Sequence, residues 1–211
     1  MQRTRGIHRA RRKKAPWPTI ALVGYTNAGK STLFNRLTKA SVLAEDLLFA
    51  TLDPTMRQVK LPGVEKAILS DTVGFVSDLP TQLVAAFRAT LEEVTSADYI
   101  VHVRDIAHPS TEGQRADVLS ILRELGIGEN GEGDSPPIIE LWNKCDKVPA
   151  EEKEQLSELA KRTPNCFLIS AQTGEGVDQF VEQLAARITS EGIERKLVLD
   201  AGQGDILAWL H

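Results

Sequence analysis

Gly24-Tyr25-Thr26-Asn27-Ala28-Gly29-Lys30-Ser31 is the stretch of this 211-residue chain that decides its fold. It fits the phosphate-binding loop pattern, in which four residues separate two glycines and Lys and Ser follow the second. The short, β-branched run at 19–23 before it predicts a buried parallel strand, and residues 30–39 after it predict a helix. This strand-loop-helix context favours a phosphate site over an ordinary glycine turn with a surface lysine.

The residue types in this loop suit a phosphate ligand. Glycines let the backbone bend so that successive N–H groups and the positive end of the following helix face an anion. Lys30 would place its charge on the β and γ phosphates, and Ser31 would offer a hydroxyl to Mg²⁺. We therefore expect the phosphates to be bound by Gly24, Tyr25, Thr26, Asn27, Ala28, Gly29, Lys30, Ser31 and Thr32.

Strand-like and helix-like runs alternate through the rest of the chain. Further strands are expected at 56–61, 65–70, 99–104, 138–142 and 166–170, and further helices at 79–94, 110–125, 150–161 and 176–188. Pro62-Gly63 predicts a tight turn that joins two antiparallel strands. The pattern predicts an α/β fold with a mostly parallel six-stranded sheet, one antiparallel strand and helices on both faces.

Two other segments could complete a metal site. Asp71-Thr72-Val73-Gly74 follows a predicted strand, at the carboxyl edge of the sheet where α/β proteins place ligand groups. Asp71 would hold Mg²⁺ through water, and the N–H of Gly74 would meet the γ phosphate. Thr51 would complete the Mg²⁺ shell beside Ser31, in a loop that orders with the triphosphate and relaxes after hydrolysis. Both have a plain alternative, because strand-end aspartates and loop threonines often only cap a turn.

Asn143-Lys144-Cys145-Asp146 follows the strand at 138–142 and indicates which base is bound. Guanine presents N1–H and a 2-amino group side by side, which the Asp146 carboxylate can accept together, whereas adenine would leave that charge unpaired. Lys144 would lay its aliphatic stem on the purine face. Ser170-Ala171-Gln172, after the last strand, would close over the base edge with backbone N–H groups. Four such polar residues are ordinary loop material by themselves, so their order along the chain carries the interpretation.

Together these segments resemble the five boxes of translation-factor-related GTPases over residues 19–190, which implies a P-loop NTPase G domain. Residues 24–35, 49–55 and 71–75 resemble, more narrowly, the HflX family of ribosome-associated GTPases. The resemblance implies hydrolysis of GTP to GDP with Mg²⁺, and binding to the 50S ribosomal subunit with a role in splitting or rescuing stalled ribosomes. It also adds nucleotide contacts from Phe49, Ala50, Thr51, Leu52, Asp53, Thr72 and Val73.

The two ends of the chain differ from the G domain expected at 19–190. Seven of the 25 Lys and Arg lie within residues 1–18, where there is no Asp or Glu, so 18 basic side chains are left against all 29 acidic ones. Residues 1–18 resemble the basic end of the family's helical linker and could contact rRNA phosphates, although a solvated helix end has the same composition. Residues 191–211 resemble the start of a truncated C-terminal region.

Composition also bears on location and assembly. The two cysteines, Cys145 and Cys166, have neither a disulfide framework nor the paired spacing of a zinc site. The chain has no signal-peptide core at its start and no apolar stretch long enough for a transmembrane segment. We expect a cytoplasmic monomer whose ligands are GTP and GDP.

The weak point of the mechanism lies at Phe75, where many GTPases carry a catalytic glutamine. Phenylalanine cannot orient water, so hydrolysis by the isolated chain should be slow, with Asn27, Lys30, Thr51 and Gly74 as the catalytic positions. Asn27 resembles the asparagine of GTPases that use K⁺ in place of an arginine finger; alternatively, it only tolerates an unusual backbone angle. Two rival functions remain: a phosphotransfer enzyme using ATP, which Asp146 argues against, and a nucleotide-gated binding module with negligible turnover.

Overall fold

The computed structural model describes residues 17–39, 55–75, 93–128 and 135–190 of the chain. Six strands form one sheet in the order β2-β3-β1-β4-β5-β6. Within these ranges β2 runs antiparallel to β3, and every other neighbouring pair is parallel, which confirms the predicted sheet. The strands are β1 (Thr19–Val23), β2 (Thr55–Leu61), β3 (Val64–Asp71), β4 (Tyr99–Asp105), β5 (Ile138–Asn143) and β6 (Cys166–Leu168).

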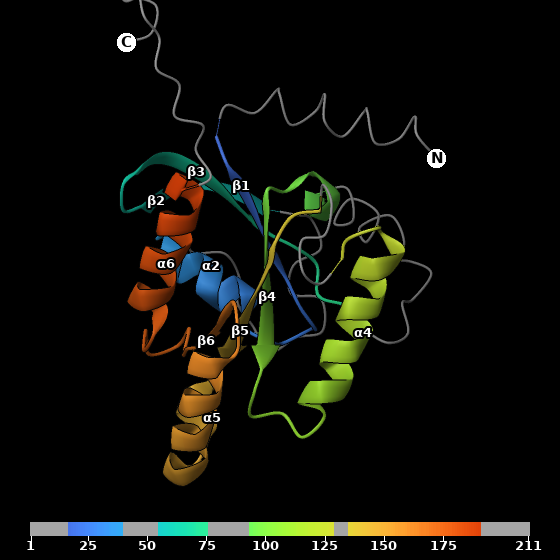
Figure 1. Cartoon of the computed structure of the whole chain (residues 1–211), viewed down its shortest axis with the longest axis vertical. Coiled ribbons are helices and arrows are strands. Elements are labelled where there is room, and N and C mark those ends of the chain that lie inside the picture. Colours follow the sequence, from blue (N-terminus) through green and yellow to red (C-terminus); the bar gives the residue numbers. More distant parts are fainter. Residues whose placement is uncertain (1–16, 40–54, 76–92, 129–134, 191–211) are drawn as a thin grey trace, which may run out of the picture.

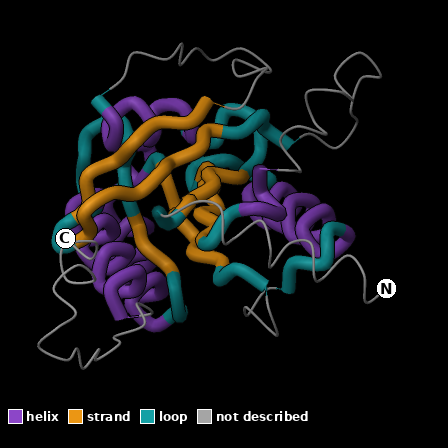
Figure 2. The backbone as a smooth tube through the Cα atoms, turned by 90° about the horizontal axis from the view of Figure 1, so that it is seen from above, coloured by secondary structure: helices purple, strands orange, loops and turns teal. Residues whose placement is uncertain are grey.

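Helices cover both faces of this sheet, as the alternating pattern predicts (Figure 1). They are α2 (Lys30–Thr38), α4 (Thr111–Glu124), α5 (Ala150–Arg162) and α6 (Val177–Ser190), with a short 3₁₀ turn η2 (Cys145–Lys147). From above, the strands cross the middle of the molecule between the helices (Figure 2). No helix in the described part of the chain has the length and apolar character needed to cross a membrane.

The central strand β1 divides the core in two. Ile20 and Leu22 belong to a cluster with buried side chains of α2 and α6, whereas Ala21 and Val23 belong to a cluster with α4. Successive side chains of a strand point to opposite faces, so one apolar run serves both layers. Residues 20–23 are all fully buried, which is why the run has no polar alternation and why it reads as a parallel strand.

Some predicted boundaries move. The strand expected to reach residue 170 ends at Leu168, because the chain then turns back on itself: the N–H of Ser170 donates to the Glu175 carbonyl and that of Gly174 to the Ser170 carbonyl. The helix predicted at 79–94 lies almost wholly outside the described residues, which contain a helical segment at 93–96. The segments at 1–16, 49–53 and 191–211 also lie outside them.

The topology brings the chemically interesting residues to one edge. Strands β1, β3, β4 and β5 are parallel, so their carboxyl ends meet on the same side of the sheet. The phosphate loop follows β1, while Asp71, Asp105 and Asn143 are the last residues of the other three strands. Ligand sites of open α/β sheets form at this edge.

Candidate functional site

The phosphate loop has a backbone that its glycines alone allow. Gly24 and Gly29 have φ of 149° and 97°. A Cβ at Gly24 would lie 2.2 Å from the Val103 carbonyl oxygen, and one at Gly29 would lie 2.3 Å from the side-chain nitrogen of Asn143. Gly29 is also the N-cap of α2 and offers no side-chain cap, so the first N–H groups of the helix face the loop. The loop therefore combines the tight bend and the helix N-terminus that bind phosphate.

Lys30 lies inside this loop. It is only 6% exposed, and its ammonium donates to the carbonyl oxygens of Gly24 at 3.2 Å and Tyr25 at 3.0 Å. Burial lowers the pKa of Lys30 to about 8, although the charge of Asp71 opposes the shift. A desolvated cation held by backbone carbonyls would gain from an anionic ligand, because the anion would compensate its buried charge.

Ser31 and Asp71 meet next to Lys30. The Ser31 hydroxyl donates to Oδ2 of Asp71 at 2.7 Å, and Asp71 is fully buried at the end of β3. A hydroxyl and a carboxylate are the oxygen ligands that Mg²⁺ prefers, so the pair fits this metal. The neighbouring Thr72 is different: its hydroxyl donates to the Leu22 carbonyl at 2.6 Å, which ties β3 to β1 inside the core.

Gly74 and Phe75 pair with the phosphate loop through the backbone. The N–H of Phe75 donates to the Gly24 carbonyl at 3.0 Å, and the N–H of Thr26 donates to the Phe75 carbonyl at 3.0 Å. A Cβ at Gly74 would lie 2.8 Å from Cα of Thr26. The Phe75 ring is fully buried in the cluster that contains Val23. The position at which many GTPases carry a water-orienting glutamine is therefore part of the core.

Asn143 connects the phosphate loop with the loop after β6. Its side-chain Nδ2 donates to the Ala28 carbonyl at 2.8 Å, and its Oδ1 accepts the N–H of Ala171 at 2.8 Å. The sequence predicts that the Ala171 N–H faces the base edge, whereas here it is bonded to Asn143. Lys144 has a left-handed backbone (φ 67°) and its ammonium pairs with Asp105 at 2.8 Å, which fixes the direction of its stem.

Asp146 is held by the same loop. The hydroxyl of Ser170, which is fully buried, donates to Oδ1 of Asp146 at 2.5 Å. That hydroxyl oxygen also accepts the N–H of Thr173 at 3.0 Å. The structure thus brings Asn143, Asp146 and Ser170 together as the sequence order predicts, and it gives the carboxylate a fixed orientation.

Two residues of this arrangement escaped the sequence reasoning. Asp105 ends β4 at the same edge as Asp71, and that strand-end position is the signal that could have revealed it. Arg36, on α2, donates from Nε and Nη2 to the carbonyls of Ala171 and Gln172 at 2.7 Å each. No local pattern marks Arg36, because its partners lie more than a hundred residues away.

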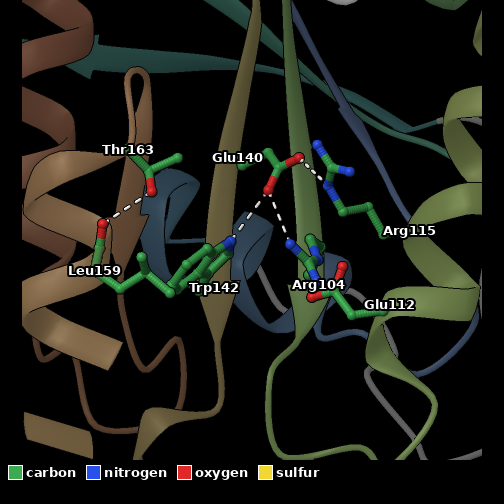
Figure 3. A network of polar contacts seen from close by, with 7 residues as sticks. All are labelled: Arg104, Glu112, Arg115, Glu140, Trp142, Leu159 and Thr163. Carbon is green, nitrogen blue, oxygen red and sulfur yellow. Dashed lines mark hydrogen bonds and ion pairs between the residues drawn. The ribbon is translucent and has the colours of Figure 1, made fainter. Parts of the chain in front are cut away.

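Behind the site, a network of charges joins β4, β5 and α4 (Figure 3). Arg104 is 4% exposed and pairs with Glu112 at 2.5 Å and with Glu140 at 2.9 Å. Glu140 also accepts from Arg115 at 2.7 Å and from the Trp142 indole at 3.1 Å. Burial opposes ionisation of Glu140, but the hydrogen bonds from Trp142 and Arg115 and the charge of Arg104 outweigh it and lower its pKa to about 2.

His102 also lies on β4, two residues before Arg104 in the sequence, and it is 1% exposed. Burial lowers its pKa to about 3, with the Glu140 charge opposing. It is therefore a neutral histidine of the core. Of the predicted site residues, Phe49, Ala50, Thr51, Leu52 and Asp53 lie outside the described part of the chain.

Two family models match this chain. Residues 19–144 match the family model described as 50S ribosome-binding GTPase, and residues 155–211 match the one described as HflX C-terminal domain. A protein named GTPase HflX from Magnetococcus marinus is 46% identical over 211 residues, which are 100% of this chain and 47% of the relative. The GTPase HflX of Escherichia coli is 42% identical over 203 residues, 96% of this chain and 46% of the relative. The chain thus spans about half the length of the curated relatives it matches.

Solved structures show the same fold. A GTP-binding protein from Sulfolobus solfataricus in complex with GDP has a TM-score of 0.63 and 28% identity, over 83% of this chain and 53% of that chain. Era in complex with MgGDPNP and nucleotides of 16S ribosomal RNA has a TM-score of 0.62 at 21% identity, over 88% of this chain and 60% of that chain. At that identity, the second likeness concerns the fold alone.

Proposed function

This chain belongs to the HflX family of GTPases, and on that premise we propose that it binds GTP with Mg²⁺ and hydrolyses it to GDP and phosphate. The observation that carries the proposal is the desolvated Lys30 ammonium, directed at the loop carbonyls beside an uncapped helix N-terminus. The alternative, a nucleotide-gated module with negligible turnover, is not favoured, because the relatives are named as GTPases.

The nucleotide would lie across the carboxyl edge of the sheet. We propose that the loop 24–32 binds the phosphates, that Ser31, Thr51 and Asp71 hold Mg²⁺, and that the segments 49–53, 71–74, 143–146 and 170–172 complete the contacts. Mg²⁺ would neutralise charge that develops on the phosphate oxygens. Lys30 would do the same from the loop, while the Asp146 carboxylate would accept from guanine N1–H and the 2-amino group.

Calorimetry with GTP, GDP and ATP tests the binding. We expect both guanine nucleotides to bind and ATP to bind at least about a hundredfold more weakly, because adenine cannot offer the Asp146 carboxylate the pair of donors that guanine offers. The variant Asp146→Asn should lose this preference. Equal affinities for GTP and ATP would contradict the proposal.

Hydrolysis needs a group other than Phe75 to stabilise the transition state. We propose that Asn27, which lies between the two glycines of the loop and has a left-handed backbone (φ 59°), supports a K⁺ ion there. Turnover of GTP should then be higher in K⁺ than in Na⁺ at equal ionic strength, and Asn27→Asp should change that ratio. Equal rates in the two salts would remove K⁺ from the mechanism.

We further propose that the whole protein acts in the cytoplasm on the 50S ribosomal subunit, splitting or rescuing stalled ribosomes as a monomer. This rests on the matched family and on the names of the relatives. In this proposal residues 19–190 are the GTP-binding domain, residues 1–18 are the basic end of a linker that contacts rRNA, and residues 191–211 begin a C-terminal region. Cosedimentation with 50S subunits in GTP and in GDP tests it, and a chain without residues 1–18 should bind more weakly.

A further inference from the structure

Arg36 links the helix of the phosphate loop to the loop proposed to read the base. Its Nε donates to the Ala171 carbonyl at 2.7 Å, and its Nη2 donates to the Gln172 carbonyl at 2.7 Å. Gly174, with φ of 97°, leaves room for this side chain, because a Cβ there would lie 2.7 Å from Nη1 of Arg36. A planar guanidinium binds the two successive carbonyls from two nitrogens held in a fixed geometry, whereas an ammonium donates from one freely rotating nitrogen.

The effect of Arg36 extends to Asp146 through one peptide and one hydroxyl. The carbonyl and the N–H of a trans peptide point in opposite directions. Arg36 holds the carbonyl of Gln172, and the N–H at the other side of that peptide, which belongs to Thr173, donates to the Ser170 hydroxyl at 3.0 Å. Ser170 in turn donates to Oδ1 of Asp146 at 2.5 Å. Because the carboxylate has no hydrogen to donate, the hydrogen of the hydroxyl is directed at it.

We propose that Arg36 is a positioning residue for base specificity: it holds the loop 170–173 so that Ser170 orients the Asp146 carboxylate toward the 2-amino and N1–H groups of guanine. The inference rests on the proposed function, since it presupposes that Asp146 reads guanine. It adds that a residue of α2, the helix that also carries the phosphate-binding Lys30, controls the selectivity for the base.

The test compares GDP with IDP, which differ only in the 2-amino group of the base. The ratio of their dissociation constants reports how well Asp146 is placed, whereas a general loosening of the pocket would weaken both alike. For Arg36→Gln we expect the Kd of GDP to rise about tenfold and that of IDP to rise about threefold or less, so that the ratio falls. Arg36→Lys keeps the charge and one hydrogen bond and should lie in between.

Arg187→Gln is the matched control. Arg187 also donates through a guanidinium, from α6 to the side chain of Asn165 at 2.6 Å, but away from the nucleotide edge. Its loss should leave the IDP-to-GDP ratio unchanged. Thermal unfolding of each variant shows whether the fold is kept, and Arg36→Lys provides the readout if Arg36→Gln does not fold.

A double-mutant cycle with Ser170→Ala tests the path. Ser170→Ala should lower the same ratio, and adding Arg36→Gln should lower it little further, because the two residues act in series. An unchanged ratio in Arg36→Gln, or full additivity in the cycle, would overturn the inference while GDP binding by the wild type still supports the function. If the wild-type chain binds no guanine nucleotide, the proposed function and this inference fail together.

Discussion

At the residue scale, Gly24 of the phosphate loop is required by space as much as by backbone angle, whereas Gly63 of the hairpin turn is required by backbone angle alone. Gly24 and Gly63 both have positive φ, at 149° and 71°. A Cβ at Gly24 would lie 2.2 Å from a carbonyl oxygen of the neighbouring strand β4, whereas at Gly63 there is nothing within 4 Å. Backbone in a sheet cannot move aside as a flexible side chain can.

Gly24→Ala and Gly63→Ala should therefore differ sharply in stability. The positive φ of Gly63 costs a substituted alanine roughly 1–2 kcal/mol. Gly24→Ala adds the clash with Val103 and should lower the free energy of unfolding by more than about 3 kcal/mol. Urea unfolding followed by circular dichroism measures both, and equal losses would contradict this reading of the phosphate loop.

Phe75 contributes its side chain to the core and its backbone to the phosphate loop. The missing glutamine suggests a defect in catalysis, but the ring is fully buried and packs in the core under α4. Its backbone, in contrast, pairs with the phosphate loop at Gly24 and Thr26.

Phe75→Gln should consequently not restore a faster GTPase. It should destabilise the protein by about 3–5 kcal/mol, the usual loss when a buried Phe side chain is removed, and a buried amide needs hydrogen-bond partners as well. The measurements are urea unfolding and single-turnover GTP hydrolysis. A variant with wild-type stability and a raised rate would show that position 75 faces the nucleotide.

At the scale of elements, Glu140 connects two strands and a helix behind the site. It accepts hydrogen bonds from Arg104 on β4, Arg115 on α4 and Trp142 on β5. These strands end in Asp105 and Asn143, which hold Lys144 and the phosphate loop. The network therefore supports the edge of the sheet at which the nucleotide is proposed to bind.

Removing the Glu140 carboxylate should lower the free energy of unfolding far more than removing an exposed carboxylate. Glu140→Ala would leave Arg104 buried without its strand partner, and breaking one side of a buried pair typically destabilises by about 3–5 kcal/mol. Glu158→Ala removes an exposed helical pair with Lys161 and should leave the thermal midpoint unchanged. Two equally stable variants would show that the network contributes nothing to the fold.

At the scale of the whole molecule, the buried groups of β4 and β5 predict acid sensitivity. His102 has its pKa lowered to about 3, so between the ordinary value of 6.5 and about 3 the unfolded chain binds a proton that the folded chain does not. Stability must therefore fall as the pH falls through that window. Glu140, with its pKa lowered from 4.5 to about 2, contributes stability above pH 4.5 that is lost between those two values.

Unfolding free energies at pH 7, 5.5 and 4.5 test this linkage. The slope due to His102 can approach about 1.4 kcal/mol per pH unit, and the replacement His102→Gln should remove it. Glu140 should add its own loss only below pH 4.5. A variant that loses stability between pH 6.5 and 4.5 as steeply as the wild type would exclude His102 as the cause.

Local patterns determined much of this protein. The run at 19–23, the glycine loop and the helix after it are neighbours in sequence, so their periodicity and spacing predict the strand, the phosphate loop and the roles of Lys30 and Ser31. The same local signal gave the six strands, the hairpin and the loops that follow the strand ends, and hence the side of the sheet on which a ligand would bind.

Only the tertiary structure decided which long-range hydrogen bonds hold these loops together. Asn143 joins Ala28 across 115 positions, and Arg36 joins Ala171 across 135. Such contacts depend on the order of the strands in the sheet, which no short segment encodes. For the same reason the sequence could not place the ring of Phe75 in the core, because burial is a property of everything that packs around a side chain.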